Sequence, residues 1–118
     1  MSYLLAIDAG TGSCRALLFT ETGDQVAASL REWTDREPPD APGGQDFDVA
    51  ANWLLIAACI RDALSAAGVT GADVAAVAAT SMREGIVLYD GAGRELWACP
   101  NVDSRAGVVI DTQSPPIA

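Results

Sequence analysis

Two amino-acid types are absent from this chain: its 118 residues contain no lysine and no histidine, so all seven basic residues are arginine. The absence of lysine excludes a P-loop lysine, a Schiff base and a Ser-Lys dyad. The absence of histidine excludes a Ser-His-Asp triad and histidine metal ligands. With 16 acidic residues the net charge is −9. No nucleic-acid partner is expected, because binding to phosphates needs a cationic surface.

Cysteine is scarce and widely spaced. The chain has three cysteines, Cys14, Cys59 and Cys99, and no C-x-x-C pair. This spacing predicts neither a disulfide framework nor a zinc site. The fold is therefore expected to depend on an ordinary hydrophobic core, for which a single domain with half of its residues hydrophobic is sufficient.

Long hydrophobic runs are also missing. The short apolar stretch that ends at Asp8 has no basic region before it, so no secretion signal is expected. The longest apolar-rich segment, residues 49–67, is interrupted by polar and charged side chains and falls short of a membrane span. We therefore expect a cytoplasmic protein with no membrane partner.

Three strands are predicted near the N-terminus. Residues 3–7 form a continuous apolar run, which is typical of a strand buried on both faces. Residues 15–20 and 25–33 follow after a glycine-containing loop and a turn, which predicts a three-stranded antiparallel meander. Residues 34–47 are rich in proline, glycine and acids, so they are expected to form a surface loop.

A helix is predicted after this loop. Asp48 is a candidate N-cap, and Gly68 is expected to end the helix. Leu54 and Leu55 fall off the apolar stripe, so they are expected either to face a further partner or to be exposed, where they would favour self-association. The stripe predicted to face the core consists of Val49, Trp53, Ile56, Ile60, Ala63, Leu64 and Ala67.

Three more strands are predicted after the helix. The alanine-rich residues 74–80 lie between turns and have the length of a strand. Residues 85–89 and 95–99 flank the turn 90–93, whose Asp and Gly residues predict a β-hairpin. The resulting order, βββαβββ, predicts an α/β fold. Residues 107–118 are expected to form a poorly ordered tail.

The first candidate site is the segment from Asp8 to Arg15, which lies between two predicted strands. A dinucleotide-binding G-x-G-x-x-G is excluded, because Arg15 stands where the third glycine would be and a strand follows. The backbone N–H groups of the turn, with its hydroxyls and the Arg15 cation, can instead surround a phosphate, and Asp8 can face a magnesium ion. An ordinary tight hairpin is the alternative. The turn consists of Gly10, Thr11, Gly12 and Ser13.

Two further candidate sites lie in the second half of the chain. Arg83 and Glu84 directly follow the alanine-rich strand. As a donor and an acceptor they can address a polyhydroxylated or carbonyl-bearing ligand, and the alternative is a pair of solvated residues at the end of a strand. Asp103 precedes Arg105 in a D-x-R pattern, which by itself is a weak signal.

Taken together, these segments resemble the FGGY carbohydrate kinases, a family of the actin/hexokinase/Hsp70 superfamily. The stretch from Asp8 to Arg15 is similar to the family's first phosphate motif. Residues 81–89 and 97–105 resemble most closely the autoinducer-2 kinases within that family. The resemblance implies a ribonuclease-H-like (actin-like ATPase) core, with a mixed sheet in the order βββαβ and a further β-hairpin.

The resemblance also implies an activity and roles for individual residues. FGGY kinases use ATP and Mg²⁺ to phosphorylate a small hydroxylated substrate, which for the autoinducer-2 kinases is linear dihydroxypentanedione. Asp8 would hold the metal and, with Arg15, would be catalytic. Arg83, Glu84 and Asp103 would bind the substrate. The phosphate would be bound by Gly10, Thr11, Gly12 and Ser13.

The length of the chain departs from the family pattern, because FGGY kinases are several times longer. Residues 1–106 are therefore expected to be the N-terminal part of the first kinase domain. A general base and an adenosine pocket are expected from other segments, so the 118-residue chain alone is expected to be inactive. Two alternatives stay open: another FGGY sugar kinase, of the xylulose or glycerol type, and a non-catalytic binding module with the same core.

Overall fold

The structure, a computed structural model, describes residues 1–107 and divides the chain into two compact units. The first unit comprises Met1–Thr34 and Val49–Met82, and the second comprises Asp35–Asp48 and the chain from Arg83 onward. The predicted tail, residues 107–118, lies outside the described residues except for Gly107. Each unit is described by itself below.

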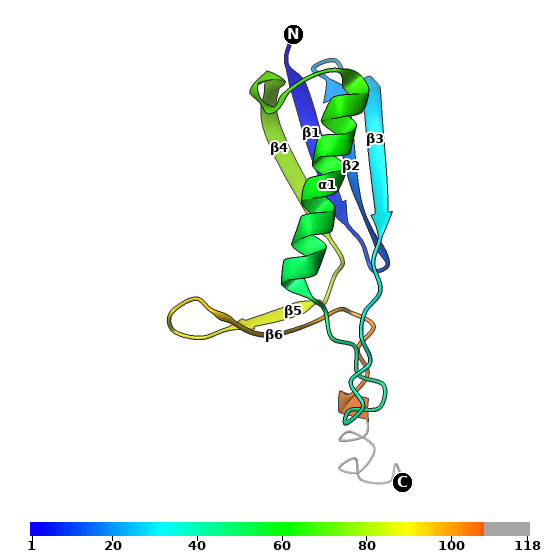
Figure 1. Cartoon of the computed structure of the whole chain (residues 1–118), viewed down its shortest axis with the longest axis vertical. Helices are drawn as coiled ribbons and strands as arrows, with labels where there is room; N and C mark the ends of the chain where they lie inside the picture. The colour runs from blue at the N-terminus through cyan, green and yellow to red at the C-terminus, as the bar shows by residue number, and fades with distance from the viewer. Residues whose placement is uncertain (108–118) are drawn as a thin grey trace, which may run out of the picture. The chain divides into compact units, whose positions relative to one another are not determined.

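A four-stranded mixed sheet forms the base of the first unit (Figure 1). Its strands are β1 (Tyr3–Ala9), β2 (Ser13–Thr20), β3 (Gln25–Glu32) and β4 (Val74–Ser81), in the order β3-β2-β1-β4. The first three strands form the predicted antiparallel meander, and β4 pairs in parallel with β1. The chain crosses from β3, at one edge of the sheet, to β4, at the other edge, through a helix.

The predicted helix is α1 (Val49–Ala67), which packs on β2 and β3. It ends where the sequence indicates, since Gly68 adopts a φ of +68°, and a 3-10 turn at Gly71–Asp73 leads into β4. Its length and apolar composition would also suffice for a membrane span. By length and composition alone, the expectation that residues 49–67 fall short of a membrane span was therefore wrong. In this structure α1 packs on β2 and β3, with Asn52, Cys59 and Ala63 buried.

Alternation along the strands decides which side chains form the core of the first unit. On β2, Cys14, Ala16 and Leu18 are fully buried, and Leu5 of β1 lies opposite Leu18 on the same face. On α1 the buried side chains are Asn52, Cys59 and Ala63. The Sγ atoms of Cys14 and Cys59 lie 3.6 Å apart, so the helix approaches the sheet closely through small side chains.

The predicted core stripe of α1 was therefore partly wrong. Trp53 was expected to face the core, but it is 60% exposed. Ala63 is buried as predicted, but the other buried residues are Asn52 and Cys59, which lie outside the predicted stripe on the side away from Trp53. Helical periodicity alone could not fix the rotation of the helix, because it depends on which side chains are small enough to lie against the sheet.

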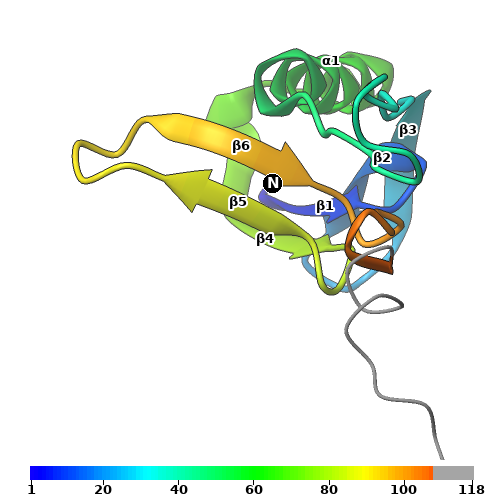
Figure 2. The ribbon, with the colours of Figure 1, turned by 90° about the horizontal axis from the view of Figure 1, so that it is seen from below.

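The second unit contains the predicted β-hairpin and the loop that precedes α1. Strands β5 (Ile86–Tyr89) and β6 (Glu95–Cys99) pair in antiparallel fashion and run side by side in Figure 2. The Asp90 carboxylate accepts hydrogen bonds from the backbone N–H groups of Ala92 and Arg94, which closes the turn. Residues 35–48 correspond to the loop that was predicted over residues 34–47. An isolated β-bridge between Arg36 and Asp46 joins the two ends of this loop.

Candidate functional site

The turn between β1 and β2, Gly10–Ser13, is the centre of the first candidate site. The backbone N–H of Gly10 donates to the carbonyl oxygen of Ser13 at 2.8 Å, which closes the turn as a hairpin. A Cβ added at Gly10 would lie 3.3 Å from that same oxygen, whereas one added at Gly12 would meet none of the described atoms within 4 Å. The turn is therefore tight at Gly10 and open at Gly12.

Asp8 and Arg15 flank this turn as a cross-strand pair. They are opposite each other in the register of β1 and β2, so their side chains lie on the same face of the sheet. It is the face opposite α1, because Cys14 and Ala16 on either side of Arg15 are buried beneath the helix. Within the described part of the chain, neither the side chain of Asp8 nor that of Arg15 makes a hydrogen bond or ion pair. A carboxylate and a guanidinium are thus both available to a ligand.

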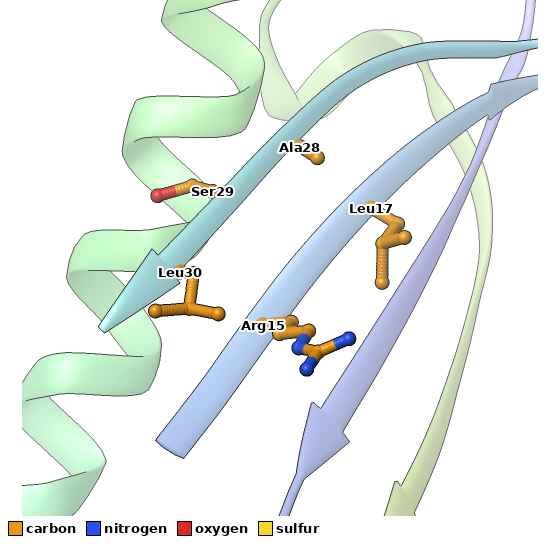
Figure 3. A pocket seen from close by; sticks show the side chains of 5 residues that line it. All are labelled: Arg15, Leu17, Ala28, Ser29 and Leu30. Carbon is orange, nitrogen blue, oxygen red and sulfur yellow. The ribbon is translucent and has the colours of Figure 1, made fainter. Parts of the chain in front are cut away.

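A shallow hollow of about 240 Å³ lies beside Arg15 on β2 and β3 (Figure 3). Its lining is mostly apolar: besides Arg15 it includes Leu17, Ala28, Ser29 and Leu30. Such a lining lacks the convergent polar groups that fix the orientation of a ligand. We interpret the hollow as uncovered sheet surface beside the guanidinium rather than as a nucleotide pocket.

The described residues fit a Mg²⁺ ion that is held mainly by waters and by the phosphates of a ligand, not one held by protein side chains alone. Within residues 1–107, no group of three or more Cys, Asp or Glu side chains is placed to hold a metal ion. Mg²⁺ keeps several waters and is commonly bound by one or two carboxylates together with substrate phosphates. The carboxylate of Asp8 is half-buried and forms no ion pair with an arginine of the described chain, so it fits that arrangement.

Trp33 contacts the turn and was not identified from the sequence. It directly follows β3 and is 7% exposed. Its indole Nε1 donates to the carbonyl oxygen of Thr11, and its backbone N–H donates to the carbonyl oxygen of Gly12, each at 3.1 Å. The observed register of β2 and β3 pairs Ser13 with Glu32 and so places the next residue, Trp33, beside the turn. The sequence carries no local signal for this contact.

Arg83 and Glu84 lie at the start of the second unit, before β5. Both side chains are exposed, and neither makes a hydrogen bond or ion pair with the residues that the structure describes. Glu84 is the one described non-glycine residue with a positive φ, at +67°. A side chain in this left-handed region is strained, and strained residues of this kind concentrate at ligand-binding positions.

Asp103 is held inside a network of the second unit. Its carboxylate accepts hydrogen bonds from the Gln45 backbone N–H at 2.7 Å and from Nε of Arg105 at 2.7 Å. Its side chain is 9% exposed. Burial raises the pKa of Asp103, but these hydrogen bonds outweigh burial and leave the pKa below its ordinary value. Asp103 therefore stays ionised and links the hairpin segment to the loop before α1.

Asp46, which the sequence did not reveal as a site residue, is the second acid of this network. One of its oxygens accepts from Nη2 of Arg105 at 2.7 Å and from Nε1 of Trp97 at 3.1 Å. Hydrogen bonds from Arg105 and then Trp97 lower the pKa of Asp46. The Arg105 guanidinium also lies 4.8 Å from the centroid of the Trp97 ring, a cation–π distance.

Gly44 allows the loop to approach this network. A Cβ at Gly44 would lie 2.8 Å from the carbonyl oxygen of Ala41 and 3.1 Å from the guanidinium of Arg105. The loop also reaches Ser104, whose hydroxyl donates to the carbonyl oxygen of Gly43 at 2.9 Å. Residues 43–46 and 103–105 are thus fixed to one another, while the exposed Arg83 and Glu84 remain outside this network.

Comparison with known proteins supports a family assignment. The model of the N-terminal domain of the FGGY family of carbohydrate kinases matches residues 3–110. An autoinducer-2 kinase of Yersinia enterocolitica is 54% identical over 104 residues, which cover 88% of this chain and 20% of the kinase. This chain therefore spans about a fifth of the length of that relative.

Solved structures confirm the predicted fold. A xylulose kinase from Rhodospirillum rubrum aligns with a TM-score of 0.77 and 26% identity over 93% of this chain and 22% of that chain. A ligand-bound xylulose kinase from Lactobacillus acidophilus aligns with a TM-score of 0.80 and 17% identity over 95% of this chain and 22% of that chain. The likeness confirms the α/β class and the ribonuclease-H-like, actin-like ATPase core with its mixed sheet.

Proposed function

The chain belongs to the FGGY family of carbohydrate kinases, and from this membership we propose that the protein transfers the γ-phosphoryl group of ATP to a hydroxyl group of a small substrate. The substrate we assign is linear dihydroxypentanedione, a form of autoinducer-2. The observation that carries this assignment is the 54% identity over 104 residues to a protein named autoinducer-2 kinase. Because the reaction consumes ATP, we place the protein in the cytoplasm.

Phosphoryl transfer leaves little covalent chemistry to the protein, so catalysis depends on positioning and on charge stabilisation. In this proposal the N–H groups of Gly12 and Ser13 bind oxygens of the transferred phosphoryl group. The Arg15 guanidinium supplies positive charge beside them, and the Asp8 carboxylate opposite Arg15 would hold Mg²⁺. Bound Mg²⁺ would neutralise charge on the phosphate oxygens.

The second unit would recognise the hydroxylated substrate. Glu84 can accept hydrogen bonds from hydroxyl groups, and Arg83 can donate to hydroxyl or carbonyl oxygens. Both side chains are exposed and make no bond within the described chain, as a ligand contact requires. Both oxygens of Asp103 are bonded to Gln45 or Arg105, so we assign Asp103 a positioning role near the substrate rather than a direct contact.

A second candidate substrate is a pentulose, because a xylulose kinase shares the fold at 26% identity. That similarity is weaker than the 54% identity to the autoinducer-2 kinase, so we rank it second. Proteins with the same fold can act on many different substrates, whereas proteins with closely similar sequences more often act on the same substrate.

The test of this function is a coupled assay of ADP formation with the natural-length protein, meaning the whole product of the gene that encodes this chain. Dihydroxypentanedione, xylulose and glycerol are compared with ATP and Mg²⁺ in excess. We expect the highest kcat/KM with dihydroxypentanedione. A preference for xylulose or glycerol would contradict the substrate assignment, and a folded protein that phosphorylates none of the three would favour a non-catalytic binding module.

Substitution of Arg83 tests which substrate the second unit contacts. Arg83→Ala is expected to raise KM for the hydroxylated substrate roughly tenfold, the size of one lost charged hydrogen bond, and to leave KM for ATP within about twofold. Arg61→Ala, at an exposed arginine of α1, is the matched control and should change neither constant. Equal damage to ATP binding would place Arg83 on the nucleotide instead.

A further inference from the structure

We propose that Trp33 positions the β1–β2 turn for anion binding, by fixing its peptide planes so that the N–H groups of Gly12 and Ser13 point outward. Trp33 would be a positioning residue, since it acts through the turn and does not contact the phosphate. The inference deepens the proposed function and rests on it for the identity of the anion, a phosphoryl group. All the contacts that support it lie within the first unit.

The key observation is that one residue binds two consecutive carbonyl groups. The Trp33 indole donates to the carbonyl oxygen of Thr11, and the Trp33 backbone N–H donates to the carbonyl oxygen of Gly12, both at 3.1 Å. The side chain is 7% exposed, so the indole donor is held in place by its surroundings. Both carbonyl groups therefore point toward the end of β3.

Peptide geometry then fixes the direction of two donors. The peptide bond is planar, and in its trans form the C=O and N–H groups point in opposite directions. No cis peptide occurs among the described residues. The Gly12 N–H shares a plane with the Thr11 carbonyl, and the Ser13 N–H shares one with the Gly12 carbonyl. Both N–H groups must therefore point away from Trp33.

Two adjacent N–H groups on one side of a turn form a small anion-binding concavity. The turn is open on the Cβ side of Gly12, because a Cβ there would meet no described atom within 4 Å apart from Gly12 itself and its chain neighbours. Glycine tolerates many conformations, so the orientation of the Thr11–Gly12 peptide depends on contacts such as the indole bond to the Thr11 carbonyl. This bond helps to orient the donors before the anion arrives.

The test measures anion binding by the whole 118-residue chain through the amide resonances of Gly12 and Ser13, with inorganic phosphate as the probe. Wild type should show shifts that saturate with phosphate. Trp33→Phe, which keeps an aromatic ring but removes the donor, should weaken binding about tenfold, the size expected for one hydrogen bond. Trp53→Phe is the matched control: it makes the same substitution at a side chain that is 60% exposed, and should bind as wild type does.

A second variant guards against a packing defect in Trp33→Phe. Benzothienylalanine, introduced at position 33 by codon suppression, has nearly the shape of tryptophan but carries sulfur in place of the N–H. It should weaken phosphate binding as Trp33→Phe does while the melting temperature stays within a few degrees of wild type. Wild-type affinity in this variant would overturn the proposal, and so would the absence of any response of the two amides in wild type.

Kinetics of the natural-length protein separate this inference from the proposed function. Trp33→Phe should lower kcat about tenfold and leave KM for the hydroxylated substrate within twofold, while Trp53→Phe changes neither. An active kinase in which both variants behave alike would contradict the role of Trp33 only. A protein that binds phosphate as described but phosphorylates no polyol would contradict the kinase assignment and leave the role of Trp33 in anion binding intact.

Discussion

Asp8 combines a position beside the β1–β2 turn with a carboxylate that has no partner in the described chain. Because no internal bond depends on its charge, Asp8→Asn should leave the melting temperature nearly unchanged. The same substitution removes the charge that would hold Mg²⁺, so we expect kcat of the natural-length protein to fall at least about a hundredfold. The measurements are a thermal melt and the ADP-formation assay. Wild-type turnover in a folded Asp8→Asn protein would contradict the metal role.

Glu84 allows backbone strain and function to be separated. At a φ of +67° a residue with a Cβ is strained by about 1–2 kcal/mol, which glycine avoids. Glycine usually stabilises less than alanine, but here Glu84→Gly should be more stable than Glu84→Ala by about 1 kcal/mol, as measured by urea unfolding. Both variants should lose activity, because the acceptor for substrate hydroxyls is gone. If Glu84→Ala is more stable than Glu84→Gly, residue 84 does not adopt the left-handed conformation.

The buried cysteines give a further prediction at this scale. Burial, and then the neighbouring Cys59, raise the pKa of Cys14 to about 11. At pH 8 the thiol is therefore protonated, and alkylation requires the thiolate. Iodoacetamide should leave Cys14 unmodified in the folded chain and modify all three cysteines in urea, as read by peptide mass spectrometry. Rapid modification of Cys14 without denaturant would contradict its packing against α1.

Among the structural elements, the loop before α1 is held in part by the carboxylate of Asp46. The pKa of Asp46 is lowered by its bonds to Arg105 and Trp97, so its stabilising effect is complete above the unfolded pKa of about 3.9. That effect is lost as the pH falls through the lower folded pKa. Asp46→Asn should therefore lower stability at pH 7 and flatten the loss of stability below about pH 4.

Urea unfolding from pH 7 to pH 2.5, followed by tryptophan fluorescence, measures this dependence, since Nε1 of Trp97 donates to Asp46. Asp40→Asn is the matched control, an exposed aspartate of the same loop, and should follow the wild-type curve. Identical pH profiles for Asp46→Asn and wild type would show that the carboxylate does not hold the loop.

The elements themselves could be predicted from the sequence because their signals are local. Glycine and aspartate residues indicated the turns, and apolar runs indicated the strands. As predicted, β1 begins at Tyr3 and α1 ends directly before Gly68. The rotation of α1 could not be predicted, because it depends on the contact between Cys59 and Cys14, which are 45 residues apart. Periodicity identified an apolar stripe that includes the buried Ala63, but packing also buries Asn52 and Cys59 and leaves Trp53 exposed.

The candidate site divides in the same way. Asp8, the glycine turn and Arg15 could be named as candidates from their order in the chain, and the register places the two charged residues opposite each other. Their roles at a phosphate site stay a prediction. The supporting residues were missed. The bond from Trp33 to Thr11 spans 22 residues, and the bond from Arg105 to Asp46 spans 59. No local pattern marks such partners, because they become neighbours only after folding.

At the scale of the whole molecule, the chain corresponds to about a fifth of the length of its autoinducer-2 kinase relative. It carries the glycine turn, Asp8 and the exposed Arg83 and Glu84, which we assign to the phosphate and the hydroxylated substrate. Several large apolar side chains are strongly exposed, among them Leu54 and Leu96, each at 66%. Self-association of the isolated chain through such side chains stays a prediction, which sedimentation at several concentrations can measure.

The last prediction concerns how much of the relative's length the reaction needs. Alignment of two reactants can lower the barrier by about 7–11 kcal/mol, and a general base adds roughly 10²–10⁴-fold. We assign neither an adenine pocket nor a base to the described residues, so the 118-residue chain alone should transfer no labelled phosphate from ATP to dihydroxypentanedione.

A hybrid kinase tests whether this chain is active when the remaining length of the relative is supplied. In it, the matched segment of this chain replaces the 104 aligned residues of the Yersinia enterocolitica kinase. If this chain supplies a working phosphate turn and substrate contacts, the hybrid should phosphorylate dihydroxypentanedione, and the hybrid with Asp8→Asn should not. Substrate-dependent transfer by the isolated chain would contradict the division of roles proposed here. A folded but inactive hybrid would contradict the assignment of this chain to the substrate of that relative.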